Sequence, residues 1–232
     1  MSQVDIKEFG DSGILIRFEE KILVKTNLKV HSLLNSLSKE KIKGVKEFIP
    51  SYRSLLVVYN PLEISFLDLK EMILNFLNKK EKIFIKRKRI IEIPAYFGSD
   101  LAPDLVFVSK YHNLKEEEFI KILIKSPYFA YMYGFLPGFI YLGGLPKILH
   151  TPRLESPRVL IPKGSIGIGG EQLGIYSLPS PGGFRIIGFT YLDLFELSEN
   201  LKVKIKEGDF VKFKRVSRDD FLKNYIGVIK FL

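Results

Sequence analysis

Apolar residues recur every three or four positions in two segments of the first 93 residues, a spacing typical of amphipathic helices. The first segment predicts a helix over roughly Val24–Lys39, and its apolar positions are Leu28, Leu33, Leu34 and Leu37. The second predicts a helix that ends at Lys79 and Lys80, whose charges suit a C-terminal dipole. Its apolar positions are Ile64, Leu67, Met72, Ile73, Phe76 and Leu77.

Short β-rich runs flank these helices. A strand over 13–18 follows the turn signal Gly10-Asp11-Ser12. Two further runs, 45–49 and 54–59, are separated by a short link and predict an antiparallel hairpin. Residues 83–85 and 90–93 complete the series. The resulting βαββαβ order predicts a small ferredoxin-like domain over residues 1–90.

After Pro94 the chain changes texture. A helix is expected near Lys115–Lys125, with Asn113 as its cap and acidic residues in its first turn. Beyond it, short strands alternate with many glycines and prolines, which predicts a closed or nearly closed β-barrel over residues 91–232. The predicted fold class is therefore α+β, with the small α/β domain followed by a barrel domain.

Composition excludes several kinds of chemistry. The chain has no cysteine, and its three histidines lie far apart without metal-binding spacing, so we expect no disulfide, no thiolate nucleophile and no metal site. No apolar run approaches the roughly 18 residues that span a bilayer. The first residues lack the features of a signal peptide, so we expect a cytoplasmic protein with no membrane partner.

The formal net charge is +10. Lys202, Lys204 and Lys206 alternate with apolar residues, as do Lys212 and Lys214, which is typical of strands that point lysine outward and resist edge pairing. The denser basic run at 86–89 lies between the two predicted domains. We therefore interpret the charge as a lysine-coated surface and expect no nucleic-acid partner.

The segment 134–188 combines glycine, proline and aromatic residues, which favours rigid loops at a barrel rim where ligands bind. The residues expected to shape the site are Gly134, Phe135, Pro137, Gly138, Phe139, Tyr141, Gly182 and Gly183. The candidate binding residues are Arg153, Arg158, Ser165, Gln172, Tyr176 and Ser180. Two guanidinium groups beside aromatic walls suit a small carboxylated or phosphorylated ligand. The alternative is that barrel corners need these glycines and prolines without any ligand.

Several familiar motifs fail. Gly167-Ile168-Gly169 lacks the third glycine of a dinucleotide fingerprint, and Lys163-Gly164-Ser165 has the wrong order for a phosphate-binding loop. Asp100 and Asp104 are candidates for a carboxylate pair, although Pro103 equally indicates a capped turn. No complete triad or dyad is found within the chain, so the catalytic residues stay unassigned.

A set of linked blocks resembles one family. The blocks are Gly-Phe-x-Pro-Gly-Phe-x-Tyr-Leu at 134–142, the two Pro-Arg pairs, Pro-x-Gly-Ser-x-Gly-Ile at 162–168, Gln-x-Gly-Ile-Tyr at 172–176 and Ser-Pro-Gly-Gly at 180–183. They resemble the family that contains the B subunit of prokaryotic ATP-dependent 5-oxoprolinase, the kinase inhibitor KipI, and allophanate hydrolase subunit 1, a carboxyltransferase C/D module. The N-terminal half agrees, with Pro-Ser-Tyr-Arg-Ser-Leu at 50–55, and so does Ala-Pro-Asp-Leu at 102–105.

The resemblance implies a cyclophilin-like barrel and ATP-dependent conversion of 5-oxoproline to glutamate. It implies partners of the A type and the C type (KipA-like), a small carboxylated substrate, ATP at the level of the complex, and a chain that is not active alone. Two departures stand out: Lys125-Ser126-Pro127 lies where the family often has a histidine, and Phe189 replaces an arginine. Inhibition of a sensor histidine kinase and a carboxyltransferase role are the alternatives.

Overall fold

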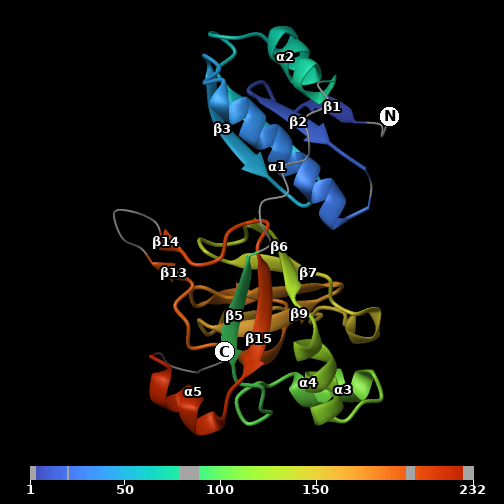
Figure 1. The fold of residues 1–232 in the computed structure, drawn as a ribbon, viewed down its shortest axis with the longest axis vertical. Helices are drawn as coiled ribbons and strands as arrows, with labels where there is room; N and C mark the ends of the chain where they lie inside the picture. Colours follow the sequence, from blue (N-terminus) through green and yellow to red (C-terminus); the bar gives the residue numbers. More distant parts are fainter. Residues whose placement is uncertain (1–3, 20, 79–88, 197–201, 227–232) are drawn as a thin grey trace. The chain divides into compact units, whose positions relative to one another are not determined.

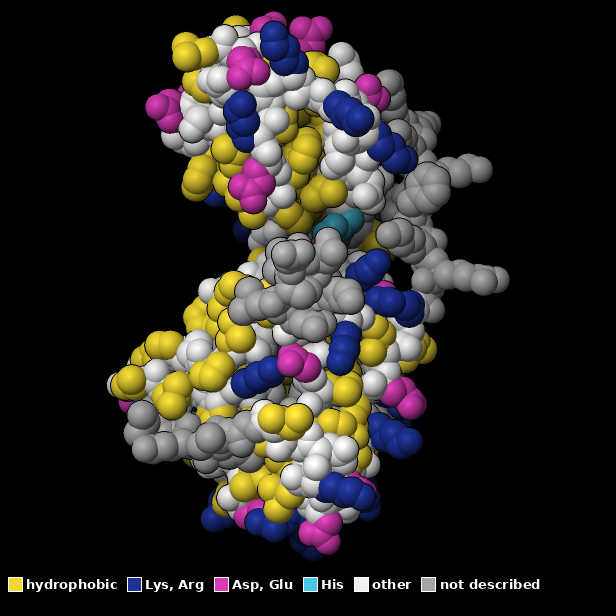
Figure 2. Space-filling view, turned by 90° about the vertical axis from the view of Figure 1, so that its left-hand side faces the viewer, with side chains coloured by type: hydrophobic (Ala, Val, Ile, Leu, Met, Phe, Trp, Pro, Cys, Tyr) yellow, Lys and Arg dark blue, Asp and Glu magenta, His cyan; other side chains and the backbone are white. Residues whose placement is uncertain are grey.

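The computed structural model describes residues 4–19, 21–78, 89–196 and 202–226 (Figure 1). The chain divides into two compact units, Met1–Arg87 and Lys88–Leu232. Among the described residues, no helix has both the length and the apolar character needed to cross a membrane. Basic and acidic side chains are interspersed over the surface that Figure 2 presents.

The first unit packs two helices on an antiparallel sheet. Alternate residues of the central strands, Ile14 and Ile16 with Leu55 and Val57, are buried in one core with residues from both helices. The strand order is β1-β2-β4-β3. The elements are β1 (Asp5–Glu8), β2 (Gly13–Arg17), α1 (Val24–Lys39), β3 (Val45–Pro50), β4 (Ser54–Tyr59) and α2 (Phe66–Asn78).

The helix predicted over Val24–Lys39 is confirmed, as is the antiparallel hairpin of β3 and β4. The predicted elements occur in the order β2, α1, β3, β4, α2 and β5 (Ile90–Ala95), but a strand that was not predicted, β1, occupies the outer position beside β2. The predicted last strand, now β5, pairs in parallel with a strand of the second unit. Its companion segment 83–85 lies outside the described residues.

The second unit is built on a seven-stranded sheet in the order β12-β9-β10-β7-β6-β15-β5. Its ends meet where Tyr96, after β5, bridges Phe189 of β12 through backbone bonds of 2.8 and 2.9 Å. The predicted α+β class with a nearly closed barrel is thus confirmed. The remaining strands are β6 (Tyr128–Tyr133), β7 (Ile140–Gly143), β9 (Ser165–Gly169), β10 (Gln172–Ile175), β12 (Arg185–Phe189) and β15 (Phe210–Arg215).

The lysine alternation has a different meaning from the predicted one. In β15, Val211 and Phe213 are buried while Lys212 and Lys214 are exposed, so the inward and outward pattern is confirmed. However, β15 lies between β6 and β5 and is not an edge strand. Lys212 and Lys214 therefore make the solvent-exposed face of β15, a central strand, polar.

Helices and short strands complete this unit. They are α3 (Leu105–Tyr111), α4 (Glu116–Lys125), the 3-10 turn η1 (Lys147–Leu149), β8 (Arg158–Ile161), β11 (Ser180–Gly182), β13 (Phe195–Glu196), β14 (Lys202–Val203) and α5 (Arg218–Asn224). The predicted cap Asn113 is wrong, because its φ of +55° places it in the turn before the helix. Instead, the Glu118 carboxylate accepts a 2.9 Å hydrogen bond from the Lys115 backbone N–H.

Candidate functional site

Three loops of the second unit meet on the outer face of the sheet: 134–139 between β6 and β7, 152–157 before β8, and 176–184 around β11. The first and third meet where the rings of Phe139 and Tyr176 lie 5.0 Å apart, edge to face. The second and third are joined by a 2.8 Å bond from the Leu154 N–H to the Gly183 carbonyl. Phe139, Tyr176 and Phe184 of the first and third loops belong to a hydrophobic cluster separate from the barrel interior.

Glycines of the sheet form the floor of this cluster. A Cβ at Gly174 would lie 2.3 Å from the Phe139 ring, and a Cβ at Gly169 would lie 2.3 Å from the Phe184 ring. Both distances are far below van der Waals contact, so only glycine lets these rings approach the strands so closely. The Gly-rich motifs therefore seat aromatic rings against the barrel wall.

The seated rings form a row that ends in a cation. Phe139 lies 6.0 Å from Phe184 and 4.8 Å from Tyr141, centroid to centroid. The guanidinium carbon of Arg153 lies 5.0 Å from the Phe184 centroid, in cation–π range. Arg153 is exposed and forms no salt bridge with any acidic residue in the described parts of the chain. This guanidinium is consequently accessible to an external anion.

Two phenols belong to the same row. Burial raises the pKa of Tyr176 to about 12, although the nearby Phe184 backbone and the charges of Arg153 and Arg158 oppose the shift. Burial likewise raises the pKa of Tyr141, while Arg153 opposes that shift. Both phenols therefore stay protonated at neutral pH and can act as hydrogen-bond donors.

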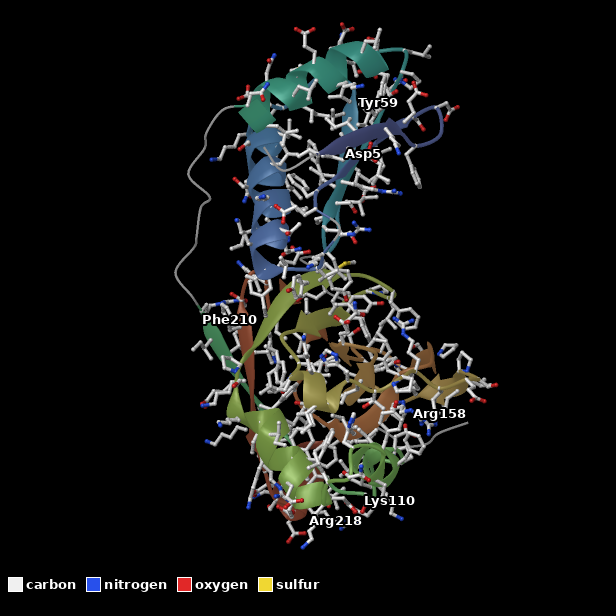
Figure 3. All side chains as sticks on the ribbon, turned by 90° about the vertical axis from the view of Figure 1, so that its right-hand side faces the viewer. Asp5, Tyr59, Lys110, Arg158, Phe210 and Arg218 are labelled. Carbon is white, nitrogen blue, oxygen red and sulfur yellow. The ribbon has the colours of Figure 1, made fainter. Side chains whose placement is uncertain are left out.

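Arg158, the other arginine after a proline and one of the residues labelled in Figure 3, pairs with an anion of its own chain. Its two terminal nitrogens donate to the two carboxylate oxygens of Asp104 at 2.7 and 2.9 Å. Asp104 also accepts a 2.7 Å bond from the Ile186 N–H. The pair ties the start of α3 to β8 and β12. Asp104 was missed as a partner because its 54-residue separation from Arg158 leaves no local signal; only its place in the Ala-Pro-Asp-Leu block pointed to it.

The remaining predicted binding residues differ in their burial and in their hydrogen-bond partners. Ser165 is fully buried and its hydroxyl donates to the Pro162 carbonyl at 2.7 Å. Ser180 is half-buried, and its Oγ is enclosed without a hydrogen-bond partner. Gln172 is half-buried at the start of β10, opposite Gly169. Ser165 thus holds a turn in place, whereas Gln172 and Ser180 remain near the cluster.

The predicted loop residues divide by role. Gly182 lies under Tyr176, since a Cβ there would be 2.3 Å from the phenol oxygen, whereas Gly183 has open space around it. Gly138 has a φ of +77° and packs on Phe195. The exposed Pro137 accepts a 2.6 Å bond from the Ser177 hydroxyl. Gly134 accepts and donates the backbone bonds that close the β6–β7 loop.

The two aspartates do not pair with each other. Asp100 accepts hydrogen bonds of 2.7 Å from both the Tyr96 hydroxyl and the Arg218 guanidinium. Asp104 lies in the separate pair with Arg158. The carboxylate-pair hypothesis is therefore wrong, and each carboxylate fastens a helix to the barrel.

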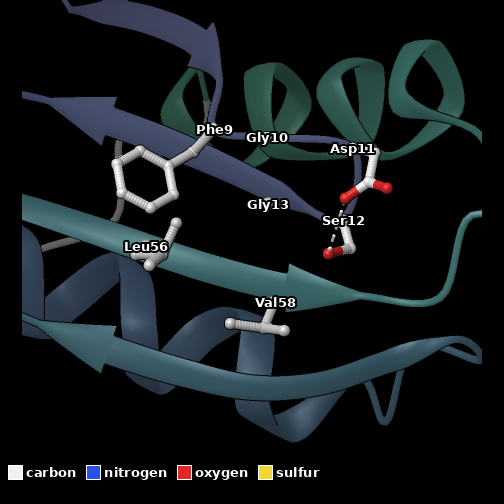
Figure 4. Close-up of a pocket in the computed structure, with 7 residues that line it drawn as sticks. All are labelled: Phe9, Gly10, Asp11, Ser12, Gly13, Leu56 and Val58. Carbon is white, nitrogen blue, oxygen red and sulfur yellow. Dashed lines mark hydrogen bonds between the residues drawn. The ribbon is translucent and has the colours of Figure 1, made fainter.

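A pocket of about 300 Å³ lies elsewhere, in the first unit (Figure 4). Its wall is mostly apolar, and its polar members Asp11 and Ser12 are joined by a 3.3 Å bond. The lining residues are Phe9, Gly10, Asp11, Ser12, Gly13, Leu56 and Val58. It holds none of the predicted site residues and offers a single carboxylate, so we do not assign the chemistry to it.

Two helix N-termini of the second unit do not suit the phosphates of a nucleoside triphosphate. Helix N-termini bind phosphate through free N–H groups and a positive dipole end. In α4 and α5 these positions carry acidic side chains: Glu116 and Glu117, and Asp219 and Asp220. Residues 19–23, ahead of α1, contain no glycine that would form a phosphate loop. We therefore derive no step through ATP on this chain.

Comparison with known proteins identifies relatives along nearly the whole chain. The 5-oxoprolinase B subunit of Bacillus subtilis (strain 168) is 38% identical over 226 residues, covering 93% of this chain and 94% of its own. The Escherichia coli O157:H7 protein of the same name is 34% identical, covering 88% and 92%. These alignments include both units.

Solved structures agree. A conserved uncharacterized protein from Pyrococcus horikoshii is 41% identical with a TM-score of 0.56, covering 94% of this chain and all of that one. TTHA0988 is 28% identical with a TM-score of 0.76; it covers 88% of this chain, which spans only 40% of TTHA0988. Residues 4–203 match the protein-family model described as "Carboxyltransferase domain, subdomain C and D". The chain therefore belongs to the carboxyltransferase subdomain C and D family.

Proposed function

We propose that this chain is the B-type subunit of an ATP-dependent 5-oxoprolinase. With A-type and C-type partners, it opens the lactam ring of 5-oxoproline by adding water across the amide bond, giving glutamate while ATP is hydrolysed to ADP and phosphate. The observation that carries the proposal is the 38% identity, over 93% of this chain, to a protein named as the B subunit of 5-oxoprolinase.

Within this complex we assign substrate contact to the Arg153 end of the aromatic row. The Arg153 guanidinium is exposed and forms no salt bridge with an acidic side chain among the described residues. The Arg158 guanidinium, in contrast, is neutralised by Asp104. A carboxylate of the substrate would gain a charge-assisted bond from Arg153. The phenols of Tyr141 and Tyr176 belong to the same row and can donate hydrogen bonds to a polar ligand beside it.

The reacting groups and the ATP site belong to the partner subunits in this proposal. The acidic N-termini of α4 and α5 disfavour phosphate, and no catalytic dyad was recognised in the sequence. In this proposal the chain is therefore inactive alone. It works in the cytoplasm and binds neither nucleic acid nor a membrane. Titration of the isolated chain with ATP should give no binding, whereas the assembled complex should bind it.

Reconstitution tests the proposal. The chain is mixed with its A-type and C-type partners, ATP and 5-oxo-L-proline, and glutamate is measured over time. Glutamate should form only when all three proteins are present. Formation at an equal rate without this chain would rule the proposal out.

The substrate assignment has its own test. Arg153→Gln should raise KM for 5-oxoproline by about tenfold or more, since a charge-assisted bond is lost. It should leave KM unchanged for 2-pyrrolidinone, the same lactam without a carboxylate. Arg17→Gln is the control, because Arg17 is an exposed arginine of β2 in the first unit and lies outside the row.

A further inference from the structure

Phe135 occupies a backbone conformation that aromatic residues rarely adopt. Its φ is +71°, and the Leu136 N–H donates to the Gly134 carbonyl at 2.9 Å, two residues back. This bond and this φ define a γ-turn of the positive-φ kind, the rarer and more strained of the two. Such strain persists only where the surroundings enforce it, and it concentrates at functional sites.

The surroundings do enforce it. The Gly134 N–H bonds to the Phe139 carbonyl at 3.2 Å, which closes the loop at the strand ends. The Ser177 hydroxyl holds the Pro137 carbonyl at 2.6 Å, which fixes the loop to the neighbouring segment. The loop backbone is thus fastened on both sides of Phe135, which fixes the direction in which its side chain leaves the loop.

The strain does not serve burial. Phe135 remains 58% exposed, although one edge of its ring contacts Phe139 at 5.4 Å and Tyr176 at 6.2 Å, centroid to centroid. A ring that packs on Phe139 and Tyr176 and is otherwise open to solvent is preorganised to contact another molecule. Fixed aromatic residues of this kind dominate the energetics of protein interfaces.

The surface around this ring is larger than a small molecule requires. Past the Phe184–Arg153 stack, the Arg185 guanidinium donates to the Pro152 carbonyl at 2.9 Å and lies 3.8 Å from the Phe107 centroid. Phe107 and its neighbour Tyr111 are 45% and 53% exposed. We call this surface, from Phe135 through Arg153 to Tyr111, the aromatic–arginine band. Aromatic residues and arginine are the residues enriched at interface cores.

We propose that Phe135 anchors a second protein subunit of the complex on the aromatic–arginine band. The occupant is a polypeptide surface with an apolar hollow for the ring and an acidic side chain for Arg185, which has no acidic partner among the described residues, whereas Arg153 is left to the substrate. This inference rests on the proposed function. It is supported by the lengths of relatives, because a chain like this one occupies only 40% of TTHA0988, where further polypeptide is covalently attached.

Phe9 provides a matched control. It is 56% exposed, nearly as much as Phe135, but lies in the first unit and outside the positive-φ region. The variants Phe135→Gly, Phe135→Ala, Phe9→Gly and Phe9→Ala separate the ring from the backbone strain. Association with the C-type partner is measured by titration calorimetry, and thermal unfolding is measured on each variant alone.

Both Phe135 variants should weaken association by about tenfold or more, as expected for an anchoring aromatic. Both Phe9 variants should stay within about twofold of wild type. In unfolding, Phe135→Gly should melt above Phe135→Ala because glycine tolerates positive φ, whereas at Phe9 the alanine variant should melt higher. That reversal reports the backbone strain at residue 135, whereas the association measurement reports the role of the ring.

The outcomes separate the two proposals. Failure of the wild-type complex to make glutamate removes the proposed function. An active complex whose association is unchanged by the Phe135 variants overturns the anchor, and so does wild-type protein that binds no second subunit. If the variants raise KM for 5-oxoproline without weakening association, the ring contacts substrate and the polypeptide occupant is wrong.

Discussion

Arg158 and Asp104 form a two-point ion pair across the second unit, with nitrogen–oxygen distances of 2.7 and 2.9 Å. Their side chains are 21% and 6% exposed. Because the carboxylate is buried and also accepts the Ile186 N–H, the pair fastens α3 to the barrel on which the aromatic row lies. The arginine of one Pro-Arg motif thus has a structural role, because it holds α3 against the strands beneath the site.

Breaking this pair should destabilise the fold. Arg158→Ala leaves the Asp104 carboxylate buried without its cation, which should lower the free energy of unfolding by about 3 kcal/mol. Urea titration measures the change. Arg215→Ala is the matched control, since Arg215 makes the same two-point contact with Glu117 at 2.7 and 2.7 Å.

The control pair differs in exposure, with side chains 40% and 60% exposed. Solvent screening limits such a pair to below about 1 kcal/mol. Equal losses in the two variants would mean that burial does not govern these pairs, and the structural role given to Arg158 would have to be abandoned.

Adjacent glycines at the end of β11 should respond in opposite ways to one methyl group. A Cβ at Gly182 would lie 2.3 Å from the Tyr176 phenol oxygen and 2.8 Å from Ile161, so Gly182→Ala must displace buried atoms. Overpacking of this kind costs about 2 kcal/mol. At Gly183 the nearest atom is 3.8 Å away, so Gly183→Ala should be neutral or slightly stabilising.

Differential scanning calorimetry of both glycine variants checks this pair of expectations. A clear drop in Tm for Gly182→Ala, beside an unchanged Tm for Gly183→Ala, is expected. Similar behaviour of the two variants would show that the Tyr176 ring is not held against β11 as described.

Local periodicity was sufficient for the elements whose contacts are local. The predicted bounds of α1 agree with the structure because its buried side, including Val30, Leu33 and Leu37, repeats at helical spacing. The pairing of β5 was beyond such reasoning, because Ile90 meets Phe210, 120 residues later. Alternating apolar residues indicate a strand but carry no information about its partner.

The arginines illustrate the same limit at the site. Arg153 and Arg158 follow prolines in identical dipeptides, so both were predicted to bind the ligand. The structure separates them, because Asp104 reaches one and Phe184 lies under the other. The strained turn at Phe135 was equally hidden, since nothing in the sequence marks a phenylalanine for a φ of +71°.

Alkaline pH should reveal how tightly Tyr176 is enclosed. Burial raises its pKa to about 12 from an ordinary value near 10, so between these pH values the unfolded chain loses a proton that the native state keeps. Stability is therefore expected to fall as pH rises through this window, with a contribution of up to about 1.4 kcal/mol per pH unit from this group.

Unfolding free energies of wild type and Tyr176→Phe, measured from about pH 9 to 12.5, should converge as the phenol's contribution disappears. Tyr111→Phe removes a phenol that is 53% exposed and should follow the wild-type curve. Parallel curves for wild type and Tyr176→Phe would instead place the Tyr176 phenol in solvent.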